Sequence, residues 1–192
     1  GTGADFVGAL TSGTAMNITT GTSLAAGGKL TATTGNMTIN SGTFATFSAA
    51  ADGATAVAGD LSITAGTVAT ITHDIEATAG SVTVDANSIT SAGTGSIIAG
   101  KSVTLDADTT ITLGEDVTAT TGNITMTAVG QVSVEDIALT TGNLSITTDA
   151  NFLNTGAGDI AVVTGDVTIT AGTTVVLDTS DLTVTTGDVA IT

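Results

Sequence analysis

The chain has 192 residues, of which 41% are hydrophobic, 25 are Gly and none is Pro or Cys, and its formal net charge is −16 with two Lys and no Arg. The charge argues against nucleic acid and anionic membrane surfaces as partners, because almost nothing here can neutralise phosphates. The absence of Cys excludes disulfides and cysteine-based metal sites. No apolar run is long enough to span a bilayer, so we expect no membrane insertion.

The composition favours β-structure. The chain contains 45 Thr and many Val and Ile residues, and it has only four aromatic residues, all Phe. Thr, Val and Ile are β-branched and suit a pleated strand better than a helix. We therefore expect an all-β protein with a core built from aliphatic side chains.

Short apolar–Thr/Ser–apolar triplets recur along the whole chain. The triplets begin at Met16, Met37, Leu61, Val82, Val103, Ile124, Leu144, Val167 and Val189. Successive starts lie 20 to 24 residues apart, and the average spacing is about 21.6 residues. A sustained period of this length is typical of a solenoid.

Each repeat holds two further short alternating runs that end in Gly, Asp, Asn or Ser, which is the pattern of strands and turns. The second run is the most variable, with expected inward residues at Leu24, Phe44/Phe47, Val68/Ile71, Ile89, Ile111/Leu113, Val132/Val134, Phe152/Leu153 and Val175/Leu177. The third run is marked by Leu30, Ile75, Ile97, Val117, Ile137, Ile160 and Leu182, and it is weakest in the second repeat, as "GATAVAG".

These patterns predict a right-handed parallel β-solenoid of about nine coils, each of ~21–22 residues with three short strands, and no helices. Coils that stack ~4.8 Å apart place equivalent side chains in columns. One inward column is expected to contain Ile39, Ile63, Val84, Leu105, Met126, Ile146 and Ile169. We expect residues 1–192 to form a single solenoid segment, uncapped at both ends.

The segments "GNLSIT" at 142–147, "GDVTIT" at 165–170 and "GKSVTLDAD" at 100–108 resemble the repeats of filamentous-haemagglutinin-like exoproteins and related bacterial surface β-solenoids. The resemblance extends from Met16 to Thr192. It implies a right-handed β-helical shaft that is secreted and acts in adhesion or as a surface fibre. It implies no catalytic residues.

Two sequence features resemble functional sites, but the repeat pattern accounts for both of them. "GSIIAGKS", residues 95–102, fits the phosphate-binding pattern G-x-x-x-x-G-K-[ST], but the repeat places a strand and a corner there, and no helix follows to hold a phosphate. His73 is the only His and has no Cys beside it, so we expect a corner residue next to Asp74. We therefore expect no enzyme. A tailspike-like polysaccharide-degrading activity is the second alternative, and it needs a carboxylate pair in a cleft.

Asp precedes the third strand in four consecutive repeats, at Asp116, Asp136, Asp159 and Asp181, and Glu115 and Glu135 form a parallel pair. Carboxylates stacked ~4.8 Å apart repel one another by about 1 kcal/mol in water. Solvation alone tolerates this repulsion. The other interpretation is a cation ladder, in which a hard cation such as Ca²⁺ bridges oxygens of neighbouring coils.

Outward residues flank the second apolar residue of each triplet and form an outward Thr ladder. Its pairs are Thr38/Asn40, Ser62/Thr64, Thr83/Asp85, Thr104/Asp106, Thr125/Thr127, Ser145/Thr147 and Thr168/Thr170. The first alternative function is therefore a surface that binds ice or carbohydrate. The function we favour is structural: the shaft of a surface fibre, an adhesin or a filament, extracellular or on the cell surface. Copies would assemble head to tail, or the coils would continue in a longer chain.

Overall fold

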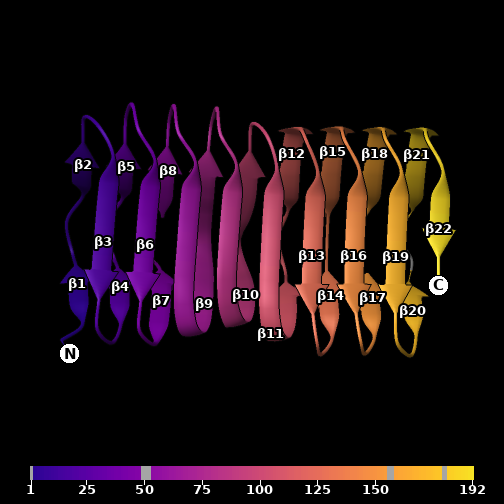
Figure 1. Cartoon of the computed structure of the whole chain (residues 1–192), viewed down its shortest axis with the longest axis horizontal. Coiled ribbons are helices and arrows are strands. Elements are labelled where there is room, and N and C mark those ends of the chain that lie inside the picture. The colour runs from indigo at the N-terminus through magenta and orange to yellow at the C-terminus, as the bar shows by residue number, and fades with distance from the viewer. Residues whose placement is uncertain (1, 49–52, 155–157, 179–180) are drawn as a thin grey trace.

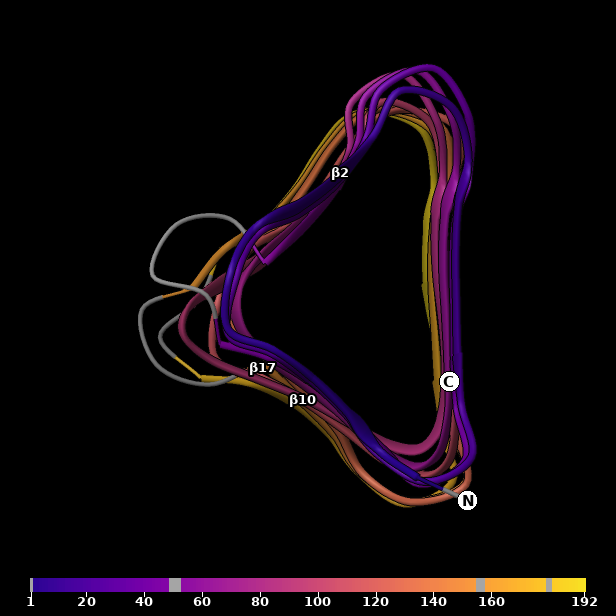
Figure 2. The ribbon, with the colours of Figure 1, turned by 90° about the vertical axis from the view of Figure 1, so that its left-hand side faces the viewer.

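The computed structural model describes residues 2–48, 53–154, 158–178 and 181–192. It confirms an all-β parallel solenoid of about nine turns with a triangular cross-section (Figures 1 and 2). Seen from the N-terminal end, the chain runs clockwise as it recedes, so the solenoid is right-handed. The described residues contain no helix, and thus none long and apolar enough to cross a membrane.

Three faces run the length of the molecule, and we number them by the order of the three runs in each repeat. Face 1 is formed by β3 (Met16–Thr20), β6 (Met37–Ser41), the first parts of β9 (Leu61–Ala77), β10 (Val82–Ala99) and β11 (Val103–Leu113), then β13 (Ile124–Ala128), β16 (Leu144–Thr148), β19 (Val167–Ala171) and β22 (Val189–Ile191). Face 2 is formed by β1 (Ala4–Phe6), β4 (Leu24–Ala26), β7 (Phe44–Phe47), the later parts of β9, β10 and β11, then β14 (Val132–Val134), β17 (Phe152–Asn154) and β20 (Val175–Leu177). Face 3 is formed by β2 (Leu10–Ser12), β5 (Leu30–Ala32), β8 (Ala54–Ala56), the ends of β9 and β10, then β12 (Val117–Thr121), β15 (Ile137–Thr141), β18 (Ile160–Thr164) and β21 (Leu182–Thr186).

Every strand pairs in parallel with the equivalent strand of at least one neighbouring coil. On face 1, for example, Ile124 pairs with Leu144 and Leu144 pairs with Val167. Three coils depart from the expected three short strands. β9 and β10 continue through both corners over 17 and 18 residues, and β11 continues through one corner over 11 residues. The backbone keeps its inter-coil pairing there, with register shifts at the bends.

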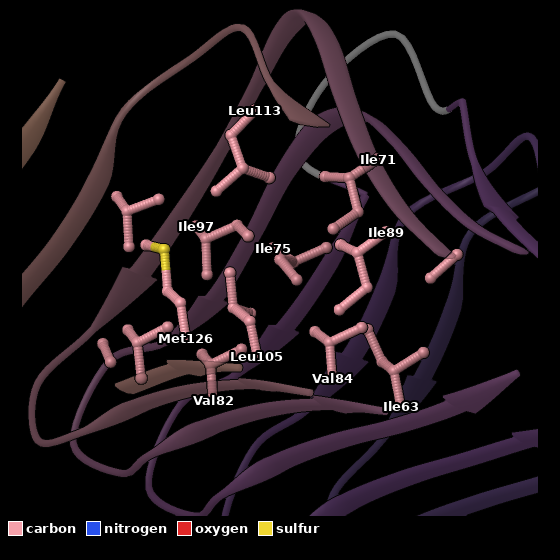
Figure 3. Packing of buried hydrophobic residues seen from close by; sticks show 14 of the residues in the cluster. Ile63, Ile71, Ile75, Val82, Val84, Ile89, Ile97, Leu105, Leu113 and Met126 are labelled. Atoms are coloured by element: carbon pink, nitrogen blue, oxygen red, sulfur yellow. The ribbon is translucent and has the colours of Figure 1, made fainter. Parts of the chain in front are cut away.

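The interior is a continuous stack of aliphatic side chains. The inward column predicted on face 1 is confirmed, since all seven of its members are fully buried: Ile39, Ile63, Val84, Leu105, Met126, Ile146 and Ile169. Figure 3 shows part of this column meeting side chains from the other two faces, including Ile71, Ile75, Ile89 and Ile97. Strand alternation explains the pattern, because every second side chain points inward.

Face 2 corrects three of the sequence predictions. Phe44 is 51% exposed, because β7 pairs with β9 in a register that points Ala45 and Phe47 inward. Val68, which pairs with Phe44, is only half-buried, and Ala69 points inward in its place. Similarly, Leu153 lies on the outer side of β17, while Phe152 and Asn154 are buried. Asn154 therefore occupies an inward position that the hydrophobic pattern did not identify.

Candidate functional site

A polar residue stands at the corner between face 3 and face 1 in every coil after the first. Its side-chain oxygen accepts the backbone N–H of the equivalent residue in the next coil. The N···O distances are 3.0 Å from Asp60 to Asn36 and 2.9 Å from Asp166 to Asn143. Eight residues form this run of inter-coil hydrogen bonds, which we call the corner ladder: Asn36, Asp60, Ser81, Ser102, Asn123, Asn143, Asp166 and Asp188.

The glycine that precedes the ladder residue is also explained by stacking. Gly142, Gly165 and Gly187 have φ values of +130°, +141° and +146°, in the region that favours Gly. A Cβ on any of them would collide with the carbonyl group of the equivalent Gly in the preceding coil. The recurring phrase Thr-Gly-Asn/Asp thus combines a close backbone approach with a side-chain acceptor for the next coil.

The four predicted cation-ladder residues, Asp116, Asp136, Asp159 and Asp181, lie in successive coils at the corner between face 2 and face 3. The backbone pairings Val117 N to Asp136 O, Ile137 N to Asp159 O and Ile160 N to Asp181 O place them one above another. Two of the carboxylates act as backbone acceptors, because Asp136 Oδ1 accepts the N–H of Asp159 at 2.6 Å and Asp159 Oδ1 accepts that of Asp181 at 3.0 Å. We call these four residues the Asp column.

Asp74 extends the same arrangement toward the N-terminus, since its Oδ1 accepts the N–H of Ser96 at 3.0 Å. The members of the Asp column are exposed or half-buried, as predicted. Within the described ranges, no three His, Asp or Glu side chains gather in a group that could hold a metal ion. Ca²⁺ binding at the Asp column stays a prediction.

The carboxyl groups of Asp116 and Glu115 are electrostatically strained. Desolvation raises the pKa of Asp116, and the charge of Asp136 and a hydrogen bond with its carboxyl raise that pKa further. Desolvation also raises the pKa of Glu115, followed by the charges of Glu135 and Asp116. In both cases the surroundings disfavour the ionised form.

Face 1 is the straight edge of the triangle in Figure 2. It carries two outward columns of polar side chains. The strand register aligns the two members of each predicted pair with their equivalents above and below, which confirms the outward Thr ladder. Asn40, Asp85 and Asp106 interrupt the column of hydroxyl groups nearer to face 2.

The phosphate-binding pattern at residues 95–102 lies on β10 and the following corner. Ile97 and Ala99 point into the core, and Val103 begins the next strand, so the motif opens no helix. His73 is a half-buried corner residue whose Nδ1 lies 3.4 Å from Thr72 Oγ1. The described surface has no pocket.

The last coil leaves core positions uncovered. Val189 and Ile191 are 49% and 44% exposed, although their equivalents one coil earlier, Val167 and Ile169, are buried. Leu10 in the first coil is 37% exposed. Both ends of the described solenoid therefore present unpaired strand edges. The last coil also exposes core positions of face 1, whereas at the first coil Leu10 is exposed and Met16 and Ile18 are buried.

Asn154 was missed because a polar residue at an inward position breaks the hydrophobic pattern. Its Nδ2 donates to the carbonyl oxygens of Val134 and Glu135, at 3.2 and 2.6 Å, so the side chain ties its own coil to the preceding one. The corner ladder was also missed, although the recurrence of Asn, Asp or Ser directly before each face 1 strand after the first is visible in the sequence.

The chain matches no protein-family model, no curated protein and no solved structure at a significant level of similarity.

Proposed function

We propose that this chain is a structural module, the shaft of an extracellular or cell-surface fibre. The observation that carries the proposal is the uninterrupted stacking of like residues. The inward column of face 1 and the corner ladder both run through the coils without a break. A rod in which each coil is hydrogen-bonded and packed to its neighbours resists bending and local unfolding. The sequence resemblance to filamentous-haemagglutinin-like surface solenoids supports the same function.

The two end surfaces support assembly into a longer rod. Each presents apolar side chains and strand edges, which are templates for pairing with another coil. An interface between two different end surfaces does not close on itself, so it generates filaments. Further coils of the same polypeptide are the alternative way of covering these surfaces.

The test is electron microscopy and light scattering on the 192-residue protein over a range of concentrations. We expect rods whose lengths are multiples of about 43 Å, which is nine coils at ~4.8 Å each. Ile191→Asp is the matched variant, because a charge on the end surface would be buried without a partner in the stacked form. A wild-type protein that stays monomeric at high concentration would contradict self-assembly.

A ligand-binding face is the second candidate. Face 1 presents hydroxyl groups in register over successive coils, and a flat array of this kind suits ordered water or a polysaccharide. Thermal hysteresis and binding to a panel of insoluble glycans test it. Thr147→Arg would place a bulky charge on the array, and binding through this face should then fall. Equal binding by both proteins, or no binding at all, would remove this candidate.

A further inference from the structure

The corner ladder has a direction, which makes the two ends of the solenoid chemically different. In every bond of the ladder the side-chain oxygen belongs to the earlier coil and the N–H to the later one. The Asp column follows the same rule. The last coil therefore presents side-chain acceptors, and the first coil presents backbone donors.

At the C-terminal end the final acceptors are two carboxylates. Asp188 donates its N–H to Asp166 Oδ1, and Asp181 donates its N–H to Asp159 Oδ1, each at 3.0 Å. No later coil of the described chain supplies an N–H to the Oδ1 atoms of Asp188 and Asp181. Both side chains are exposed at the end surface.

At the N-terminal end the equivalent positions hold no acidic side chain. Ala15 precedes Met16 on face 1, and Ala9 precedes Leu10 on face 3. Their N–H groups occupy the ladder-donor positions of the first coil, and the described chain places no coil before them. Donors at one end thus match carboxylate acceptors at the other.

The core columns match in the same way. The column that begins with Leu10, which is 37% exposed, ends with Leu182, and the column that begins with Ile18, which is buried, ends with Ile191. A second copy placed as the next coil sets these aliphatic residues against each other. Thr14 lies where most coils have the Gly that precedes the ladder residue. A side chain is tolerated at this position, because Lys101 occupies it directly before Ser102.

We propose that the C-terminal end of one copy binds the N-terminal end of a second copy, with Asp188 and Asp181 accepting the backbone N–H groups of Ala15 and Ala9 of that copy. This inference depends on the proposed self-assembly, and it adds the contacts and the polarity of the interface. Contacts between two C-terminal ends are disfavoured, because they bring four carboxylates together. Assembly is therefore strictly head to tail.

The first experiment compares the critical concentration for assembly of two double variants, Asp181→Asn with Asp188→Asn and Asp181→Ala with Asp188→Ala. Both remove two negative charges, but only Asn keeps the acceptor, as Asn36, Asn123 and Asn143 do inside the ladder. We expect the Asn variant to assemble at least as well as the wild type. The Ala variant should need a roughly ten- to hundred-fold higher concentration, because two hydrogen bonds are lost. Circular dichroism and melting of dilute monomers check folding, which should survive because the N–H groups that bind Asp166 and Asp159 remain.

The second experiment tests polarity with Leu10→Asp, which blocks the N-terminal end, and Ile191→Asp, which blocks the C-terminal end. Each variant alone should stay monomeric, and their mixture should give a 1:1 dimer by light scattering. Growth of filaments by either variant alone, or no dimer in the mixture, would overturn the head-to-tail polarity. Equal critical concentrations for the Asn and Ala variants would overturn the carboxylate contacts while leaving the fibre proposal intact. A wild-type protein that never assembles would instead overturn the proposed function, and this inference with it.

Discussion

Asn143 Oδ1 accepts the backbone N–H of Asp166 at 2.9 Å, across the boundary between two coils. Asn143 donates its own N–H to Asn123 Oδ1 at the same distance. A short polar side chain (Asn, Asp or Ser) at one corner therefore accepts a backbone N–H just before the start of a face 1 strand. This arrangement resembles the capping of a helix N-terminus, where a side-chain oxygen also serves an unpaired N–H.

Asn143→Ala removes one acceptor of the corner ladder, and we expect it to lower the free energy of unfolding by about 1–2 kcal/mol. Asn143→Asp should be close to neutral, because Asp fills the same role at positions 60 and 166. Asn40→Ala is the control, since Asn40 is exposed on face 1 outside the ladder. Thermal or denaturant unfolding measures all three. An Asn143→Ala variant as stable as the control would show that the ladder bonds contribute nothing.

Ile146→Asp places an unpaired charge in the fully buried column of face 1, which costs several kcal/mol. We expect the stack to open at this coil, so that the amides of β13 and β19 lose their hydrogen-exchange protection together with those of β16. Ile146→Val is the matched control, and it should cost only about 0.5–1.5 kcal/mol. Protection that persists in the neighbouring coils of the Asp variant would mean that the column has been assigned wrongly.

Asp116→Asn tests the electrostatic strain at the Asp column. Because the pKa of Asp116 is raised in the folded state, the folded protein binds this proton more tightly than the unfolded protein does. The wild type therefore loses stability as the pH rises from the ordinary Asp pKa of 3.8 through the raised value, and the loss is complete above it.

We expect Asp116→Asn to melt higher than the wild type at neutral pH, and the difference to shrink as the pH falls below this window. Asp149→Asn, at an exposed position away from the column, controls for the change in net charge. If the difference in melting temperature between Asp116→Asn and the wild type did not change with pH, the pKa of Asp116 would not be raised in the folded protein.

Calcium binding at the Asp column predicts that the melting temperature rises between excess chelator and millimolar Ca²⁺. The physical reason is that a ligand bound only by the folded state stabilises that state by mass action. The double variant Asp136→Asn with Asp159→Asn keeps the backbone acceptors and removes two charges, so it should lose the response. Identical melting temperatures of the wild type with and without Ca²⁺ would contradict calcium binding. The Asp column would then be a solvated row of side chains that accept backbone hydrogen bonds.

The inward columns of face 1 could be read from the sequence because they depend on a local rule. Successive side chains of a strand alternate between its two sides, so Ile146 and its equivalents had to share one side once the repeat was recognised. The stacking of the Asp column followed from the same regular period. In both cases the alternation along a strand and the repeat period are visible in the sequence.

Only the tertiary structure decided the inward residues of face 2 and the use of the polar corner residues. Phe44 is more hydrophobic than Ala45, yet Ala45 is inside, because pairing between β7 and β9 sets the register. Asn154 is inside for the same reason, and its carbonyl partners lie in the preceding coil. The residues of the corner ladder can be found in the sequence, but the direction of its hydrogen bonds cannot. That direction depends on whether each backbone N–H points toward the preceding coil or the following one. This orientation is defined only in the stacked structure.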